Sequence, residues 1–165
     1  MYLDPQAQAI ADQLAHLPRP DFSTLSVADY RAMLAAFPMP SDGDDGLASV
    51  TDDSLPGPGG PLAVRIFRPV GAAPLPLTVF FHGGGFISCG IDTHTNLCSR
   101  LAALSGSIVA AVDYRLAPEH RFPAAVDDCA TALRFITAEA TALRIDPSRI
   151  AVGGDSAGGN LSAVM

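Results

Sequence analysis

The stretch VGGDSAGGN, residues 152–160, sets a serine between glycines directly after an apolar run that begins at Ile150. The pattern Gly154-x-Ser156-x-Gly158 predicts an abrupt turn from a strand into a helix, because the two glycines let strand and helix approach closely. The first N–H groups of that helix have no partner within it and point at whatever binds there. The stretch therefore predicts an exposed nucleophilic serine, with a purely structural turn as the alternative.

A second glycine-rich segment follows an earlier apolar strand. HGGGF, residues 82–86, comes directly after LTVFF, residues 77–81. Three glycines leave backbone N–H groups unshielded, and acyl transfer needs such donors where the tetrahedral oxygen forms. Phosphate binding is the rival use, but no Lys-Ser or Lys-Thr pair follows and the spacing does not match G-x-G-x-x-G. A plain glycine-rich turn stays open as the third interpretation.

Strands and helices alternate after residue 46. Five segments are predicted to be strands: 47–53, 62–69, 77–83, 107–114 and 146–154. A Gly/Pro-rich turn at 55–61 joins the first two, which are expected to form an antiparallel edge. The later strands are apolar on both faces, which indicates a parallel sheet covered on both sides.

Two helices are predicted between the later strands. Residues 94–105 place three leucines on one side, namely Leu97, Leu101 and Leu104. Residues 123–137 form an amphipathic helix whose buried stripe is expected to hold Val126, Cys129, Leu133 and Ile136.

Two further helices are predicted before residue 46. Asp4 and Pro5 form a helix start, and apolar residues then recur at helical spacing: Leu3, Ala7, Ile10, Leu14 and Leu17. Ser26 opens the second helix and Pro38 ends it. The acidic segment SDGDDG, residues 41–46, is expected to be a solvated turn, because its spacing does not match a calcium-binding EF-hand loop.

Composition bounds the class of protein. The chain has 165 residues, of which 48% are hydrophobic, and a formal net charge of −7. The acidic balance argues against nucleic acid or an anionic membrane surface as the main partner. No apolar run is long enough to span a bilayer, and the first residues lack the features of a signal peptide.

The three cysteines are an odd and widely spaced set. Cys89, Cys98 and Cys129 are expected to be reduced thiols in a cytoplasmic protein. Cys89 is expected to be a buried structural thiol, with a place in the pocket as the alternative. Cys89, His94 and Cys98 lack a fourth ligand, so no metal site is expected.

Three segments together resemble the hormone-sensitive-lipase-like group of α/β-hydrolases, whose bacterial members are carboxylesterases. They are HGGGF, DYRLAPEHRFPAAVDD at 113–128 and GDSAGGN at 154–160. The resemblance begins near residue 60. It implies an α/β-hydrolase fold with a mostly parallel sheet, helices on both faces and an N-terminal helical cap. Residues 1–46 would be the cap segment and 47–165 the N-terminal half of the catalytic domain.

The resemblance also implies a role for individual residues. Ser156 would be the nucleophile. The N–H groups of the oxyanion hole would come from Gly84, Gly85 and Ala157, in a loop supported by His82 and Gly83. A structural brace would be formed by Asp113, Tyr114, Arg115 and Glu119.

A serine nucleophile needs a histidine to take its proton and a carboxylate to orient that histidine. All four histidines precede Ser156: His16, His82, His94 and His120. The order in this fold is serine, acid, histidine. The chain is therefore expected to be truncated after the nucleophile elbow and inactive alone, with the acid and base in a missing C-terminal half. An upstream histidine is the alternative.

The predicted function is that of a serine carboxylesterase. It would hydrolyse short- to medium-chain esters through an acyl-enzyme intermediate, without metal or cofactor. Its partners would be a small-molecule ester and the missing C-terminal half, and a homodimer is one option. A small-molecule receptor on the same scaffold is the alternative, since related plant hormone receptors keep the pocket and lose the catalytic histidine. A nucleotide-binding doubly wound domain is disfavoured because no phosphate-loop lysine is present.

Overall fold

The computed structural model describes residues 3–16, 20–35 and 46–165. The helices are α1 (Pro5–Ala15), α2 (Val27–Ala35), α3 (Ile91–Ser105), α4 (Ala124–Ala138) and α5 (Ala157–Val164). The strands are β1 (Leu47–Gly57), β2 (Gly60–Pro69), β3 (Leu75–Phe81), β4 (Ile108–Val112) and β5 (Ile145–Gly154). The predicted acidic turn, Gly46 excepted, and the expected positions of Leu17 and Pro38 lie outside the described residues.

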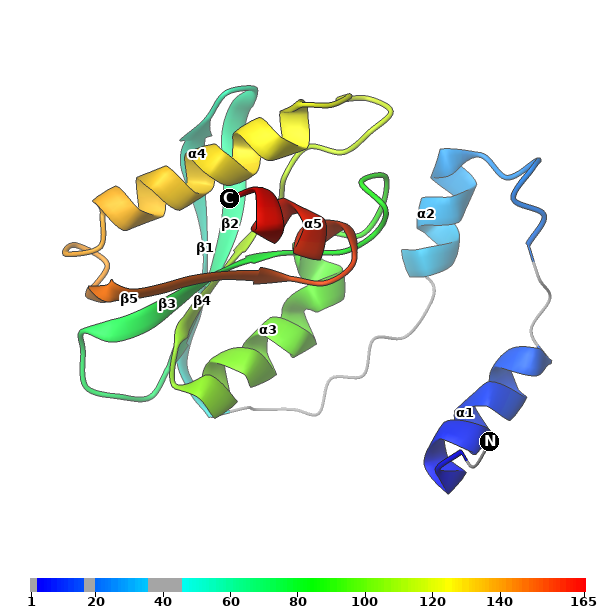
Figure 1. Ribbon diagram of the computed structural model, residues 1–165, viewed down its shortest axis with the longest axis horizontal. Coiled ribbons are helices and arrows are strands. Elements are labelled where there is room, and N and C mark those ends of the chain that lie inside the picture. Colours follow the sequence, from blue (N-terminus) through cyan, green and yellow to red (C-terminus); the bar gives the residue numbers. More distant parts are fainter. Residues whose placement is uncertain (1–2, 17–19, 36–45) are drawn as a thin grey trace.

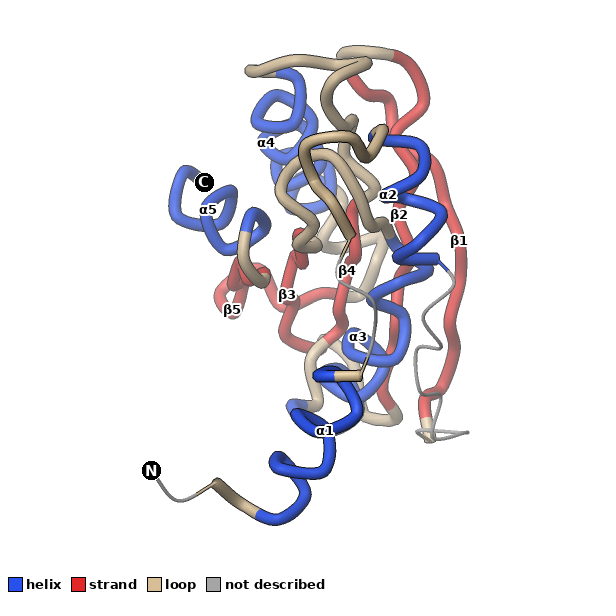
Figure 2. The backbone as a smooth tube through the Cα atoms, turned by 90° about the vertical axis from the view of Figure 1, so that its right-hand side faces the viewer, coloured by secondary structure: helices blue, strands red, loops and turns tan. Residues whose placement is uncertain are grey.

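The five strands form one mixed sheet in the order β1-β2-β4-β3-β5 (Figure 2). β1 pairs antiparallel with β2, and β2 pairs antiparallel with β4. β3 lies parallel between β4 and β5. This order brings the ends of β3 and β5 side by side, so the two glycine-rich segments that follow these strands meet at one edge of the sheet.

Helices cover both faces of the sheet, with α3 on one side and α4 and α5 on the other (Figure 1). Alternate residues of each strand point to opposite faces. In β3, Val79 and Phe81 belong to the core under α4, whereas Phe80 packs with Cys98 of α3. Within the described ranges, no helix combines the length and the apolarity that crossing a membrane requires.

The buried side of α3 differs from the prediction. Leu97 is 47% exposed and Leu104 is 83% exposed, so only Leu101 of the three leucines packs against the core. The buried residues are Cys98 and Ala102. Their small side chains let α3 lie close to the sheet, which the leucine spacing could not reveal. In α4 the predicted stripe is confirmed: Cys129 and Ile136 are buried, and Val126 and Leu133 pack partly buried against the same core.

The hairpin between β1 and β2 is tighter than predicted. Pairing continues to Gly57 and Gly60, so the turn shrinks from 55–61 to Pro58 and Gly59. Leu55 and Leu62 face each other in this extension and are both buried. Their burial favours continued pairing over the open turn that the Gly/Pro composition predicts.

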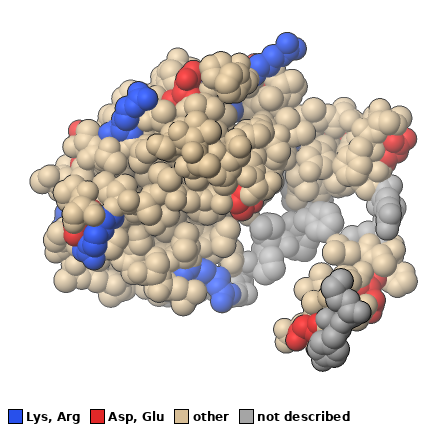
Figure 3. Space-filling view, viewed as in Figure 1, with Lys and Arg blue, Asp and Glu red and all other residues tan. Residues whose placement is uncertain are grey.

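The two N-terminal helices begin as predicted. The Asp4 carboxylate accepts a hydrogen bond from the Gln6 N–H at 2.8 Å, and Ser26 Oγ accepts one from the Asp29 N–H at 3.1 Å. α1 contains no buried residue, so its predicted apolar face is uncovered. Figure 3 shows this helix as a projection with acidic side chains on its surface.

Candidate active site

The predicted elbow is present between β5 and α5. Ser156 is exposed and has φ 50° and ψ −115°, a conformation that L-residues rarely adopt. A Cβ atom added at Gly154 or at Gly158 would overlap the carbonyl oxygen of Phe81 at the end of β3. Both motif glycines are therefore required, because the elbow rests directly on the neighbouring strand.

The loop after β3 is folded back on itself. The carbonyl oxygen of Gly84 accepts hydrogen bonds from the N–H groups of Ile87 and Ser88, at 3.1 and 3.0 Å. Gly84 has φ 117° and Gly85 has φ 61°, so their N–H groups turn away from the strand direction. In the described part of the chain, the N–H groups of Gly84, Gly85 and Ala157 donate no hydrogen bond. Three free donors thus lie in the loop and at the start of α5.

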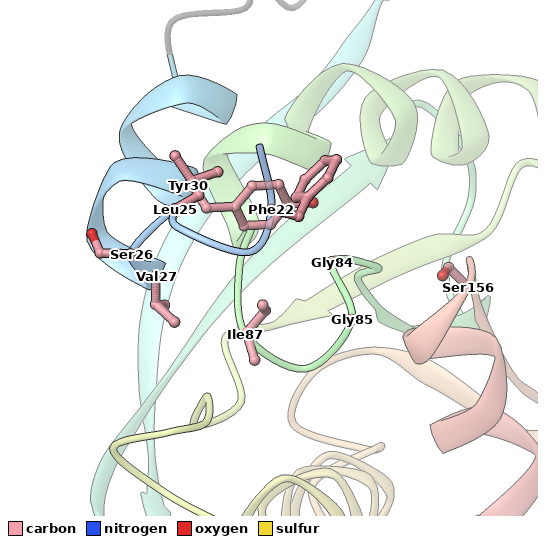
Figure 4. A pocket seen from close by; sticks show the side chains of 9 residues that line it. All are labelled: Phe22, Leu25, Ser26, Val27, Tyr30, Gly84, Gly85, Ile87 and Ser156. Atoms are coloured by element: carbon pink, nitrogen blue, oxygen red, sulfur yellow. The ribbon is translucent and has the colours of Figure 1, made fainter. Parts of the chain in front are cut away.

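A cavity of about 440 Å³ lies between the elbow, the loop, and α2 with the segment that precedes it. Figure 4 shows Ser156 on one side of it, Gly84 and Gly85 in the middle, and the side chains of Phe22 and Tyr30 opposite. Its lining residues are Phe22, Leu25, Ser26, Val27, Tyr30, Gly84, Gly85, Ile87 and Ser156. Phe22 and Tyr30 are the aromatic residues of the N-terminal segment that line this cavity. Ala157 is buried just behind Ser156.

Asp155 connects the elbow to the glycine loop. Its Oδ1 accepts a hydrogen bond from the Gly83 N–H at 2.9 Å, and a Cβ atom at Gly83 would overlap the same carboxylate. His94 Nε2 lies 3.1 Å from Asp155 Oδ1. Sequence reasoning missed this contact, because His94 is 61 positions before Asp155 and carries no local motif.

His82 supports the loop from beneath. Its ring is buried and stacks on Tyr114, with ring centroids 4.3 Å apart. The Tyr114 hydroxyl donates to the His82 carbonyl at 2.7 Å. Burial lowers the pKa of His82, which favours the neutral ring, and its Nδ1–H then donates to the Gly83 carbonyl at 2.7 Å. His82 therefore holds the backbone that precedes Gly84.

The remaining residues of the predicted brace hold loops in place. The Arg115 side chain makes two hydrogen bonds to the buried Asp128 carboxylate, at 2.8 and 2.9 Å. The Asp113 N–H donates to the carbonyl of Ala63 in β2. Glu119 pairs with Arg31 of α2. These contacts are structural, and none of them involves Ser156.

Arg31 fastens α2 to the loops around the cavity. It donates to the carbonyls of Ile87 and Ala117, at 2.6 and 3.0 Å, and both its terminal nitrogens donate to the Glu119 carboxylate. The hydrogen bonds from Arg31 hold the pKa of Glu119 at about 2, below its ordinary 4.5. Because the folded pKa is the lower one, the stabilisation is complete above about pH 4.5 and is lost as the pH falls toward 2.

We expect Arg31→Ala to loosen α2. The variant removes a cation and four donated hydrogen bonds, so amides of residues 27–35 should exchange with deuterium on the order of tenfold faster, as local opening becomes easier. Hydrogen-exchange mass spectrometry at pH 7 measures this. Arg134→Ala, at an exposed position of α4, is the control and should leave the segment unchanged. Equal exchange in Arg31→Ala and the wild type would contradict the anchoring role.

The described residues contain no complete catalytic triad. No hydrogen bond joins Ser156 Oγ to a histidine ring within the described ranges, which include all four histidines. His94 uses Nε2 for Asp155 and Nδ1 for Thr93 Oγ1 at 2.9 Å. His82 lies buried beneath the loop, and His16 and His120 are exposed. This geometry disfavours an upstream histidine as the base.

The cysteines lie apart from the Ser156 cavity. Cys98 and Cys129 are buried in the two cores, and burial raises the pKa of Cys98 to about 12. Cys89 is only half-buried, which corrects the expectation of a buried thiol, and it lines a separate cavity of about 380 Å³ with Arg31 and Leu34. Its place on the turn that begins α3 explains the exposure. No group of three metal-ligating side chains occurs among the residues that the structure describes.

Comparison with known proteins supports the α/β-hydrolase fold that the sequence motifs predict. The sequence pattern of a family with the α/β-hydrolase fold matches residues 78–165. The carboxylic ester hydrolase LipN of Mycobacterium tuberculosis is 48% identical over 142 residues, which cover 85% of this chain and 36% of that protein. The ethyl acetate hydrolase of Pseudomonas putida is 45% identical over 63% of this chain and 34% of that protein.

Solved structures extend the likeness to the N-terminal helices. A hyperthermophilic esterase from the archaeon Pyrobaculum calidifontis superposes with a TM-score of 0.84 at 40% identity, covering 99% of this chain and 53% of that one. The chain thus spans about half the length of this structure and about a third of its curated relatives. The elbow, the HGGG loop and these matches show that the chain belongs to the α/β-hydrolase family, in its hormone-sensitive-lipase-like carboxylesterase group.

Proposed function

We propose that the protein containing this chain is a serine carboxylesterase that acts on short- to medium-chain esters. The observation that carries the proposal is the shared cavity, in which an exposed, strained Ser156 faces the free donors of Gly84 and Gly85. A similar chain is named an ethyl acetate hydrolase, which agrees with a small acyl group. The cavity of about 440 Å³ has room for a small ester beside the cap.

The proposed reaction proceeds in two steps. Ser156 Oγ attacks the carbonyl carbon of the ester while its proton passes to a histidine, and the carbonyl oxygen becomes an oxyanion. The N–H groups of Gly84, Gly85 and Ala157 stabilise that oxyanion. The C–O bond to the alcohol then breaks, the histidine returns the proton to the leaving oxygen, and water hydrolyses the acyl-serine by the same route. This route uses side chains and backbone donors alone.

The histidine and the acid of the triad are proposed to come from residues outside this chain. Residues 1–46 would serve as the cap segment and 47–165 as part of the catalytic domain, an assignment supported by the cavity that both segments line. The location in the cytoplasm and the option of a homodimer stay predictions from the sequence.

Covalent labelling tests the assignment of Ser156. We expect an alkyl phosphonate ester probe to form one adduct on the full-length protein, located at Ser156 by proteolysis and mass spectrometry. The reaction joins Ser156 Oγ to phosphorus and expels the leaving group. Ser162→Ala, in the helix that follows Ser156, should label normally, whereas Ser156→Ala should not label. An adduct on any other serine would contradict the proposal.

The receptor interpretation makes a different prediction for the same protein. A receptor on this scaffold would keep the elbow and the cavity but would lack the histidine that takes the serine proton. This agrees with the absence of a histidine bonded to Ser156 in the described residues. A receptor would bind a small ester without releasing alcohol. Measurable turnover of p-nitrophenyl butyrate that disappears in Ser156→Ala would decide for the esterase.

A further inference from the structure

We propose that His94 is a positioning residue for ester hydrolysis, which acts through Asp155 to fix the oxyanion loop relative to Ser156. The proposal rests on the function proposed above. It concerns a residue of α3 that lies outside the three sequence motifs of the site.

One carboxylate oxygen links the two halves of the site. Asp155 Oδ1 accepts a hydrogen bond from the Gly83 N–H at 2.9 Å and lies 3.1 Å from His94 Nε2. Asp155 directly precedes Ser156, and Gly83 directly precedes Gly84. This oxygen therefore connects the residue before the proposed nucleophile to the residue before the proposed donors.

The contact with Asp155 depends on which ring nitrogen of His94 carries the hydrogen. An ionised carboxylate can only accept, so an attractive contact with Asp155 requires a hydrogen on His94 Nε2. His94 Nδ1 contacts Thr93 Oγ1 at 2.9 Å, and the same hydroxyl lies 2.8 Å from the Gly90 carbonyl. The single hydroxyl proton can go to His94 or to Gly90. When it goes to His94, Nδ1 accepts it and the hydrogen of the neutral ring is on Nε2, which lies 3.1 Å from Asp155 Oδ1.

The histidine is better fixed than the carboxylate that it contacts. The His94 side chain is 12% exposed, whereas the Asp155 side chain is 48% exposed. Phe80 and His82 flank the His94 ring, with centroids 6.1 and 5.6 Å away. A half-exposed carboxylate has alternative rotamers and water as a competing partner. The rigid ring of His94 selects the rotamer that also bonds the Gly83 N–H.

The arrangement separates His94 from the chemical step itself. Both its ring nitrogens have partners, and neither partner is Ser156. Its influence is thus exerted on the placement of the oxyanion donors, which act in the transition state more than in the ground state. Loss of His94 should accordingly change kcat more than KM.

The test compares two substitutions at one position in the full-length protein. His94→Leu removes the donor, and we expect kcat for p-nitrophenyl butyrate to fall about tenfold with KM within about twofold. This is less than the 10²–10³ expected for complete loss of an oxyanion donor, because the donors are displaced and not removed. His94→Gln can place an amide N–H near the position of Nε2, and we expect its kcat within about threefold of the wild type.

A second readout does not need catalysis. In His94→Leu the amide of Gly83 should exchange with deuterium faster than in the wild type and in His94→Gln, because its acceptor is no longer held. Unchanged kcat and unchanged exchange in His94→Leu would overturn the proposal, and so would a Gln variant as impaired as the Leu variant. A proportional rise of KM would also overturn it. If the wild type shows no Ser156-dependent turnover, the esterase proposal fails, and the exchange experiment still decides whether His94 positions the loop.

Discussion

Ser156→Ala is expected to lower kcat by about 10⁶-fold in the full-length protein, because the variant has no oxygen to form the acyl-enzyme. The residual rate would come from the oxyanion donors and from substrate binding, which the alanine leaves in place. KM should change little, since the substitution removes one atom from a cavity that eight other residues line. Steady-state hydrolysis of p-nitrophenyl butyrate over a range of concentrations measures both constants.

Ser162→Ala is the matched control for this experiment. Ser162 lies in α5, the helix that follows Ser156, and its hydroxyl donates to the Gly158 carbonyl at 2.8 Å. Its loss should leave kcat within about twofold, because the bond lies within the helix and involves none of the proposed oxyanion donors. A Ser156→Ala variant that keeps more than about one per cent of the wild-type kcat would mean that another residue performs the attack.

The second large effect is expected at Gly84. Gly84→Ala should lower kcat by about 10²–10³, the cost of losing one oxyanion donor. The residue has φ 117°, and an added Cβ atom would overlap the Ser88 carbonyl oxygen, so the loop must change shape and carry its N–H away. The measurement is kcat for the same ester, with far-ultraviolet circular dichroism to establish that the protein is folded.

Gly85→Ala separates the steric effect from general damage to the loop. At Gly85 φ is 61°, and an added Cβ atom has no neighbour within 4 Å. The only cost is the left-handed backbone, about 1–2 kcal/mol for an L-residue. We expect a loss of kcat of about tenfold or less. Equal effects at Gly84 and Gly85 would show that the close approach of Ser88 is not what matters.

The parts of the site proposed to carry the chemistry have sequence motifs because the contacts that shape them are local. The glycines around Ser156 and after His82 are required by backbone contacts within a few residues of a strand end, and such requirements leave a motif. The order of strands and helices from β1 to α5 followed from apolar runs in the same way. What local patterns could not supply was the exposure of individual helix faces, as Leu97 and Leu104 of α3 show.

The polar contacts that assemble the site were not predictable. Arg31 reaches Glu119 across 88 positions, and His94 reaches Asp155 across 61. Each of these side chains would be equally suited to a solvated surface, so its identity contains no information about its partner. Each pair comes together only in the folded protein, where α2 is bound to the loops around the cavity and α3 packs on one face of the sheet.

The backbone conformation of Ser156 lowers the free energy of unfolding of the protein. A residue in such a sparsely populated conformation destabilises the fold by about 1–3 kcal/mol, whereas a whole domain is stable by only about 5–15 kcal/mol. Glycine at this position would relieve the strain, and selection for stability alone would favour it. If Ser156 is the proposed nucleophile, its φ of 50° makes it a place where thermostability and reactivity oppose each other. Stabilising changes elsewhere in the chain would let the protein keep this residue at higher temperature.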